Sequence, residues 1–295
     1  MTTPHPAPDT AARSLAHWSE AGRREMEAFY ALARLDYELL AKALDWNVLF
    51  TRLREERGAE LTLLDVACGS GKFPEALLAH AALEGLDAVR YDLLDPSAFS
   101  LREAAAVLEP PFVEGTHFES TLEDLAPVAG PWDVVWATHA LYALQPAKLA
   151  EAVARYVSAL APGGVSVLAQ GASDGHYLRV YEAFLEGVRG GEGTAYVSSD
   201  DLIGELRAQG AEPEVRRLRY DHVISEQDTA VLEGYLQRCV FDDTVPLAEL
   251  LEAPVLGPYL ASQHDAAAGV YRFHQEVDCV VVSPPEGAVP WTAAS

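Results

Sequence analysis

A strand that ends in a glycine-rich turn is the stretch of this sequence best suited to hold a ligand. The segment LTLLDVACGSGKF contains Gly69 and Gly71, which have no Cβ atom and let a ligand approach the backbone closely. A phosphate-binding P-loop is excluded, because Val66 replaces its first glycine and Phe73 follows the lysine. A dinucleotide fingerprint fails because its third glycine is replaced by Pro74. The turn therefore predicts either a ligand other than a nucleotide diphosphate or a plain strand-to-helix connection.

Polar side chains follow two further expected strands. Asp95 ends the second strand, where a carboxylate offers two adjacent oxygens to the hydroxyls of a ribose, and Asp92 is the alternative acid. His139 and Tyr142 follow the fourth strand. Because ligands bind outside the carboxyl ends of parallel strands, we expect both side chains to face the reacting groups. An ordinary hydrogen-bonded structural role is the competing interpretation of His139.

Alternating strands and helices must position these residues. An apolar run at 61–66 is typical of a strand buried on both faces. This alternation indicates a mostly parallel, doubly wound α/β sheet, closed by two late strands that suggest an antiparallel edge pair. A helical pattern begins at Ser14 and continues for about forty residues, whereas Thr244–Leu260 contains three prolines and resembles a loop. The expected strands are 61–66, 87–95, 112–115, 132–138, 165–169, 214–222 and 270–282.

The same patterns divide the chain into four parts. Residues 1–12 are expected to form a disordered tail, and residues 13–57 an N-terminal helical cover. Residues 58–171 form the α/β core that carries the glycine turn. Residues 172–295 are expected to contain an insertion that builds the cover together with the N-terminal helices, followed by the closing antiparallel strands. Aromatic residues are dense in the cover, so it is either an ordinary helical face or a lid over a second pocket.

Composition limits the classes of partner. The chain has 295 residues, 49% hydrophobic and 22% charged, which are the proportions of a soluble globular protein. Its 21 basic and 45 acidic residues give a net charge of −24, which argues against nucleic acid as a partner. Its apolar runs are shorter than the ~18 residues of a membrane helix, so we expect no membrane association. A monomer or a homodimer is expected.

The cysteines and the first ten residues indicate the cellular compartment of the protein. Cys68, Cys239 and Cys279 are few and unpatterned, so we expect free thiols and no zinc or other metal site. Residues 1–10 lack the apolar core of a secretory signal. Together these features predict a cytoplasmic protein.

The arrangement Asp65-x-x-x-Gly69-x-Gly71 resembles the first motif of class I S-adenosylmethionine (SAM) dependent methyltransferases. Several other stretches, in the same order, resemble the histamine N-methyltransferase family within that class. The resemblance implies a Rossmann-like, seven-stranded sheet with a small helical acceptor-binding cover, and SAM as cofactor. The stretches that carry it are LDPSA from Leu94, WD at Trp132, HALY from His139, YVSSDDL from Tyr196 and the closing strand from Phe273.

The resemblance also implies roles for individual residues. Tyr142 retains an acceptor-binding tyrosine, while His139 replaces a glutamine that hydrogen-bonds the acceptor. Gln275 lies about where the family has an asparagine, and Glu38 where it has a substrate-orienting glutamate. Ala143 replaces a second tyrosine, which opens the pocket and departs from a histamine site. The implied contacts with SAM are Asp65, Gly69, Gly71, Asp95, Ser100, Thr121 at the adenine and Thr138.

Methyl transfer from SAM asks the protein mainly to align an acceptor lone pair with an activated methyl group. A protonated amine must first lose its proton, and His139, with an ordinary pKa of about 6.5, is suited to accept that proton directly or through water. We therefore expect a methyltransferase of a small molecule, with nitrogen favoured as the acceptor atom. An O-methyltransferase of a natural product is the first alternative. A SAM-binding protein with another activity is the second.

Overall fold

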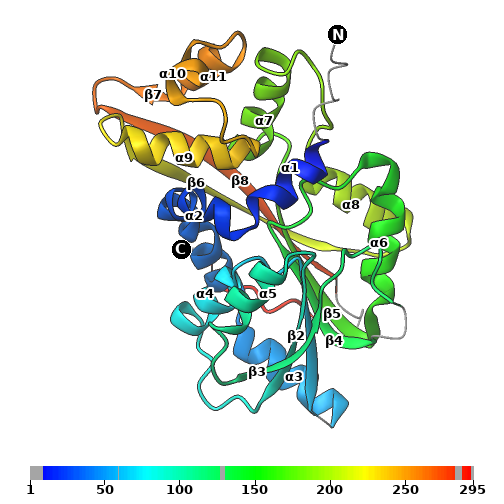
Figure 1. Ribbon diagram of the computed structural model, residues 1–295. Coiled ribbons are helices and arrows are strands. Elements are labelled where there is room, and N and C mark those ends of the chain that lie inside the picture. Colours follow the sequence, from blue (N-terminus) through cyan, green and yellow to red (C-terminus); the bar gives the residue numbers. More distant parts are fainter. Residues whose placement is uncertain (1–8, 59, 127–129, 283–287, 294–295) are drawn as a thin grey trace.

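The computed structural model describes residues 9–58, 60–126, 130–282 and 288–293. Its centre is an eight-stranded sheet with the order β3-β2-β1-β4-β5-β8-β6, in which the short β7 pairs with β8 (Figure 1). β1 to β5 run parallel, while β8 runs antiparallel to both β5 and β6. The strands are β1 Leu61–Val66, β2 Val89–Leu94, β3 Phe112–Phe118, β4 Trp132–Thr138, β5 Leu160–Gly171, β6 Glu214–Ser225, β7 His264–Asp265 and β8 Val270–Val282.

The predicted fold class is confirmed, including the antiparallel pair at one edge. β1 lies between β2 and β4, so the chain moves outward from β1 through β2 to β3 and then returns to β4 on the other side. This reversal of strand order is where open α/β sheets hold their ligands, outside the carboxyl ends of the strands. The glycine turn follows β1 and therefore lies at this position.

Helices cover both faces of the sheet. Leu61 and Leu63 of β1 pack into one apolar cluster with α2 to α5, whereas Leu64 and Val66 pack into another with α6 and α8. Burial on both faces explains why this strand is apolar nearly throughout. The helices are α1 Thr10–His17, α2 Arg23–Ala43, α3 Trp46–Arg57, α4 Lys72–His80, α5 Ala98–Ala105, α6 Leu149–Ser158, α7 His176–Gly187, α8 Ser199–Ala208, α9 Thr229–Val240, α10 Leu247–Glu252 and α11 Leu256–Ser262.

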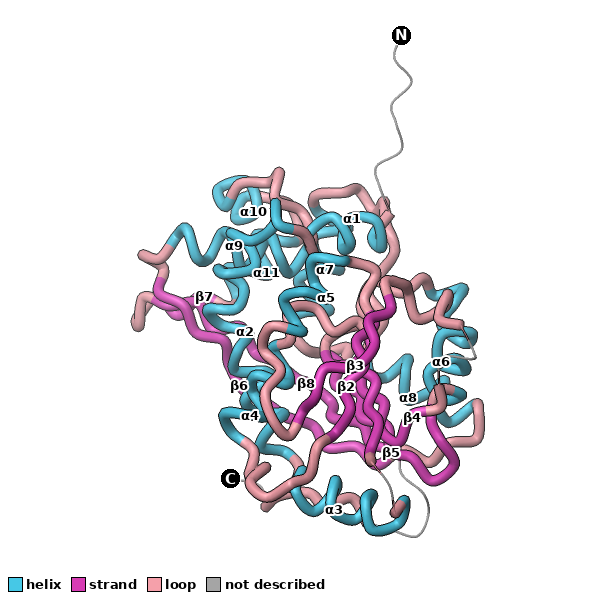
Figure 2. The backbone as a smooth tube through the Cα atoms, turned by 60° about the horizontal axis from the view of Figure 1, so that its bottom comes forward, coloured by secondary structure: helices cyan, strands magenta, loops and turns pink. Residues whose placement is uncertain are grey.

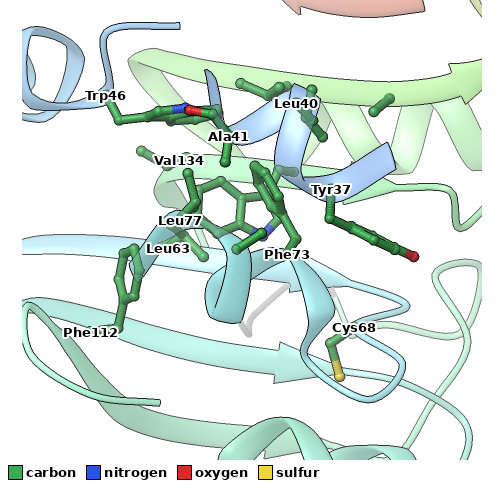
Figure 3. Close-up of a cluster of buried hydrophobic side chains, with 14 of the residues drawn as sticks. Tyr37, Leu40, Ala41, Trp46, Leu63, Cys68, Phe73, Leu77, Phe112 and Val134 are labelled. Atoms are coloured by element: carbon green, nitrogen blue, oxygen red, sulfur yellow. The ribbon is translucent and has the colours of Figure 1, made fainter. Parts of the chain in front are cut away.

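Aromatic packing fixes the start of α4 behind the glycine turn. The ring of Phe73 lies 5.5 Å from that of Trp46 in α3 and 4.9 Å from that of Trp136 in β4, both in edge-to-face contact. Figure 3 shows Phe73 and Trp46 in this cluster, with Cys68 of the turn nearby. The turn is thus anchored to the core at its helical end.

A third apolar cluster lies between α7, α9, α10, α11 and the ends of β6 and β8. Figures 1 and 2 both place these helices and α1 at one end of the molecule, with α3 at the other. The expected cover therefore combines segments from the two ends of the chain. Within the expected N-terminal cover, residues of α1, Trp18 and residues of α2 line two adjoining cavities of the molecule. No residue of α3 lines either cavity.

The N-terminal segment differs from the single long helix that we expected. It forms α1, α2 and α3, interrupted near Gly22 and again at Asp45. A Cβ on Gly22 would lie 2.4 Å from the carbonyl oxygen of His17, so the first turn requires glycine. The carboxylate of Asp45 accepts the backbone N–H of Val48 and caps α3.

Two other boundaries differ from expectation. Helix α1 begins at Thr10, capped by Asp9, so the expected tail ends earlier than residue 12, and its residues 1–8 lie outside the described residues. The segment 244–260, expected to be a loop, contains α10 and α11. Pro246 precedes α10 and Pro258 lies in the first turn of α11, where a missing N–H is tolerated, so these prolines start helices. Within the described residues, no helix is both long and apolar enough to cross a membrane.

Candidate functional site

The glycine turn adopts a backbone that needs its glycines. Gly69 has φ 53° and Gly71 has φ 71°, both in the left-handed region that side chains disfavour. A Cβ on Gly71 would lie 2.5 Å from a side-chain methyl of Val107, so this glycine permits close packing against the end of α5. A Cβ on Gly69 would lie 3.5 Å from the ring of Trp18. The turn is thus packed behind Gly71 and covered by an indole at Gly69.

Asp95 is joined to the turn by hydrogen bonds. Its Oδ2 accepts the backbone N–H of Gly69 at 3.0 Å, and its Oδ1 accepts that of Ser97 at 2.8 Å. The side chain is 5% exposed, and burial raises the pKa of its carboxyl group to about 6. Each carboxylate oxygen retains a further lone pair, so Asp95 can still accept hydroxyl groups of a ligand.

The larger of two adjoining cavities, about 390 Å³, lies over the turn. Its size falls within the ~300–1,000 Å³ of small-molecule sites. Helix α1 and Trp18 close one side of it, and the loops after β1, β2, β3 and β4 form much of the rest, together with Tyr30 and Tyr37 of α2 and with Phe241. The sequence-predicted residues that line it are Gly69, Asp95, Thr121, Thr138, His139 and Tyr142.

The smaller cavity, about 50 Å³, is lined mainly by aromatic side chains, and we call it the aromatic cavity. It shares Trp18, Tyr37, His139, Tyr142 and Phe241 with the larger cavity. A ligand in one cavity would therefore contact the same side chains as a ligand in the other. The remaining lining residues are Phe29, Asp36, Tyr177, Tyr196, Arg238 and Cys239.

His139 and Tyr142 form a hydrogen-bonded pair where the cavities meet. The Tyr142 hydroxyl accepts the backbone N–H of Gly171 at 2.9 Å and lies 2.8 Å from Nδ1 of His139. We assign the hydroxyl proton to the bond with Nδ1, so the imidazole proton resides on Nε2. Burial lowers the pKa of His139, and its Nε2 has no hydrogen-bond partner among the described residues. His139 is thus a neutral side chain with a free donor.

Asp36 is a buried carboxylate on the wall of the aromatic cavity. Its Oδ1 accepts Nε2–H of His222 at 2.6 Å and the hydroxyl of Tyr220 at 2.8 Å, and its Oδ2 accepts the hydroxyl of Tyr177 at 2.6 Å. Burial raises the pKa of Asp36, but the charge and hydrogen bond of His222 outweigh it, so the net shift is downward. Asp36 is therefore ionised at neutral pH.

The model of a methyltransferase domain family matches residues 64–166, a stretch that contains the glycine turn, Asp95 and His139. The match covers about a third of the chain, and over these residues the chain is similar to a methyltransferase domain. A comparison with curated protein sequences found no match.

Solved structures share the fold of this chain at low sequence identity. Magnesium protoporphyrin IX methyltransferase from Synechocystis PCC 6803, with bound S-adenosylhomocysteine, is 15% identical with a TM-score of 0.52, covering 94% of this chain and 100% of that one. The same enzyme with bound SAM is 12% identical with a TM-score of 0.51, covering 95% and 100%. A methyltransferase-like protein from Bacillus halodurans C-125 is 17% identical with a TM-score of 0.51, covering 80% and 98%. The particular likeness to histamine N-methyltransferase stays a prediction.

The larger cavity fits SAM, the cofactor of this methyltransferase domain. Bound SAM supplies an activated methyl group on a sulfonium. The buried carboxylate of Asp95 is suited to ribose hydroxyls, and the backbone of Gly69 lines the same cavity beside the ring of Trp18. Apolar side chains of Leu122 and Leu141 line the same cavity and suit a flat base.

Some predicted cofactor residues lie away from the cavity lining. Asp65 is buried in β1 and accepts the hydroxyl of Tyr91 at 2.7 Å, so it supports the turn from behind. Gly71 packs on α5, and Ser100 is fully buried in α5. These residues can act on the cofactor through the backbone that they position, because neither cavity includes them in its lining.

Two predicted acceptor residues are not at the cavity. Glu38 lies on the surface of α2 and pairs with Lys42, because positions 36 and 38 fall on different faces of a helix. Gln275 is buried in β8, with its amide nitrogen 3.2 Å from Nδ1 of His222 and from the Tyr235 hydroxyl. It therefore supports the Asp36 cluster and does not line the aromatic cavity.

Sequence reasoning missed Asp36, Trp18 and Arg238 as cavity residues. Trp18 and Asp36 stand in a helical stretch whose aromatic density indicated a lid, but register decides which residues face inward. Arg238 lies in a helix that carried no local motif. The described residues contain no group of His, Cys, Asp and Glu suited to hold a metal ion.

Proposed function

We propose that this methyltransferase acts on a nitrogen atom of a small molecule, an amine or an imidazole, that occupies the aromatic cavity. The observation that carries the proposal is the shared wall of the two cavities, with His139 and Tyr142 at their junction. An acceptor held there lies against the same side chains as SAM. Holding two reactants in this way supplies the proximity that methyl transfer requires.

Charge and shape support a small nitrogen acceptor. Aromatic side chains surround the aromatic cavity and can pack against a flat or cationic group. Asp36, rather than Glu38, is the carboxylate positioned to orient an amine, since it is ionised and lines this cavity. The Nε2–H of His139 donates to a lone pair elsewhere on the acceptor, so His139 orients the substrate in this arrangement.

An O-methyltransferase is the second candidate, favoured by the same free donor. The Nε2–H of His139 suits a carbonyl, carboxylate or phenol oxygen as well as a nitrogen-containing group. A cavity of about 50 Å³ limits either acceptor to a small reactive end.

The decisive experiment offers the purified protein a panel of small amines, imidazoles and phenols with methyl-labelled SAM. Label transferred to nitrogen supports the proposal, and label found only on phenol oxygen replaces it with the second candidate. Titration calorimetry with SAM, NAD, NADP and ATP accompanies the panel. Saturable SAM binding without transfer to any member would favour a SAM-binding protein with another activity. Tyr142→Phe should lower turnover and leave SAM affinity nearly unchanged.

A further inference from the structure

Arg238 is a buried cation with an incomplete set of partners. Its side chain is 2% exposed, and its Nη1 donates to the carbonyl oxygen of His17 at 2.6 Å. The guanidinium carbon lies 4.0 Å from the centroid of the Trp18 ring. Its Nε and Nη2 have no hydrogen-bond partner among the described residues. Two donors of a fork suited to a carboxylate are therefore unused.

The charge of Arg238 has no carboxylate in contact with it among the described residues, and Glu25 acts on it only from beyond ion-pair distance. None of the ion pairs formed by the described residues includes Arg238. Burial lowers the pKa of its guanidinium to about 10, which still leaves it charged at neutral pH. Burying a charge without a counter-ion is costly, and removal from water normally requires a paired anion. An anionic ligand would supply both the charge and the hydrogen-bond acceptors.

The position of Arg238 indicates which anion it would meet. Arg238 lines the aromatic cavity beside Trp18, and Trp18 also lines the larger cavity. Asp36 lines the aromatic cavity as well, so this small space has one cationic and one anionic wall residue. A molecule with an amine and a carboxylate complements both.

We propose that Arg238 binds a carboxylate at the aromatic cavity, which makes the acceptor an amine that also carries a carboxylate, as in an amino acid. This substrate class rests on the proposed N-methyltransferase function. The methionyl carboxylate of SAM has the same chemistry and is the other possible source, since Trp18 borders both cavities. Either source gives Arg238 the partner that its free donors require.

The test compares ligands that differ in one carboxylate. The first arm titrates SAM and decarboxylated SAM into the wild type, Arg238→Gln and Arg238→Lys. The second arm titrates histidine against histamine, and tyrosine against tyramine, into the protein saturated with S-adenosylhomocysteine. Arg216→Gln is the matched control, because Arg216 also stacks on a tryptophan, Trp291, and donates to backbone carbonyls, but lines neither cavity.

We expect Arg238→Gln to weaken the binding of the carboxylated ligand in one pair by about 10- to 100-fold. The affinity for the ligand of that pair without the carboxylate should not change. Loss confined to the first arm assigns the carboxylate to SAM, and loss confined to the second assigns it to the acceptor. Arg238→Lys should retain part of the affinity for the carboxylated ligand, and Arg216→Gln should retain all of it. Equal losses for both members of each pair, or none, would overturn the proposal.

The test of Arg238 gives a result even if the variant does not fold or the protein methylates no amine. If Arg238→Gln fails to fold, the wild type still decides, because equal binding of both members of every pair overturns the proposal without any variant. Calorimetry measures binding in the absence of turnover. A failure to methylate any amine therefore contradicts the proposed function and leaves the first arm as a separate test of Arg238.

Discussion

The Tyr142 hydroxyl lies 2.8 Å from Nδ1 of His139 and at the same time accepts the backbone N–H of Gly171 at 2.9 Å. With the hydroxyl proton assigned to the bond with Nδ1, the imidazole proton is on Nε2. The lone pair that a general base would use is engaged with Tyr142. In this assignment His139 acts as a donor, whereas the sequence-based expectation made it the base, and its role in the reaction stays a prediction.

Substitutions of His139 can distinguish whether its side chain acts as a hydrogen-bond donor or as a base. His139→Gln retains a side-chain N–H, so we expect it to keep turnover within about tenfold of the wild type, whereas His139→Leu should lose about 100-fold or more. Steady-state kcat with the best acceptor measures both, and calorimetry should find SAM affinity nearly unchanged in each. Equal large losses in the two variants, with a pH dependence of kcat that disappears, would instead identify His139 as the base.

SAM affinity should depend on pH through Asp95. Burial raises the pKa of this carboxyl group to about 6, and only the ionised form accepts two hydroxyl groups side by side. Affinity should therefore be constant above pH 7 and fall below pH 6, approaching tenfold per pH unit. Calorimetric titration of SAM between pH 5 and pH 8 checks this. Asp95→Asn should bind SAM weakly with a flat profile, and an unchanged affinity in that variant would falsify the ribose assignment.

Asp65 should affect stability more than cofactor binding. Burial raises its pKa from 3.8 to about 7, so the folded protein favours the protonated acid. This contribution to stability is fully present below pH 4 and is lost as the pH rises through 7. Asp65→Asn should therefore gain stability relative to the wild type as pH rises, by up to about 4 kcal/mol at pH 8. Urea unfolding at pH 4.5 and pH 8 measures the difference, and an equal effect at both values contradicts the assignment.

Asp65→Asn also serves as a control for Asp95→Asn. The two substitutions remove the same charge, but Asp65 lines neither cavity whereas Asp95 lines the larger one. We expect Asp65→Asn to retain SAM affinity within a few-fold at pH 7.5.

The two turn glycines should respond differently to alanine. Gly71→Ala places a Cβ 2.5 Å from Val107 and 2.9 Å from the Cα of Ala104 in a left-handed backbone, so we expect a loss of about 2–5 kcal/mol in unfolding free energy. In Gly69→Ala the new Cβ contacts only the Trp18 ring, at 3.5 Å. We expect the left-handed backbone alone to lower the unfolding free energy by about 1–2 kcal/mol. Chemical denaturation measures both. A smaller loss for Gly71→Ala than for Gly69→Ala would contradict this packing.

Local patterns predicted the central part of the fold and of the site. The apolar run of β1, the glycine turn and the acid after β2 are close in sequence, and strand–turn–helix order places them at one edge of a parallel sheet. Asp95 could be placed at the larger cavity because its position depends on a strand end. The helix cap at Ser198 was also readable, since its side chain and Asp201 form a local capping box.

The acceptor side was decided by tertiary structure. Asp36 lies in α2, Arg238 in α9 and Trp18 directly after α1, and their meeting at the aromatic cavity depends on how these helices pack. Glu38 lines neither cavity whereas Asp36 does, because a shift of two residues on a helix turns a side chain by about 200°. The hydrogen-bonding state of His139 follows from Gly171 through Tyr142, a long-range contact. Local patterns were enough to predict the sheet and the turn, and the resemblance to class I methyltransferases predicted the cofactor. The acceptor cavity and its charges needed the packed structure, because they arise from contacts between residues far apart in the chain.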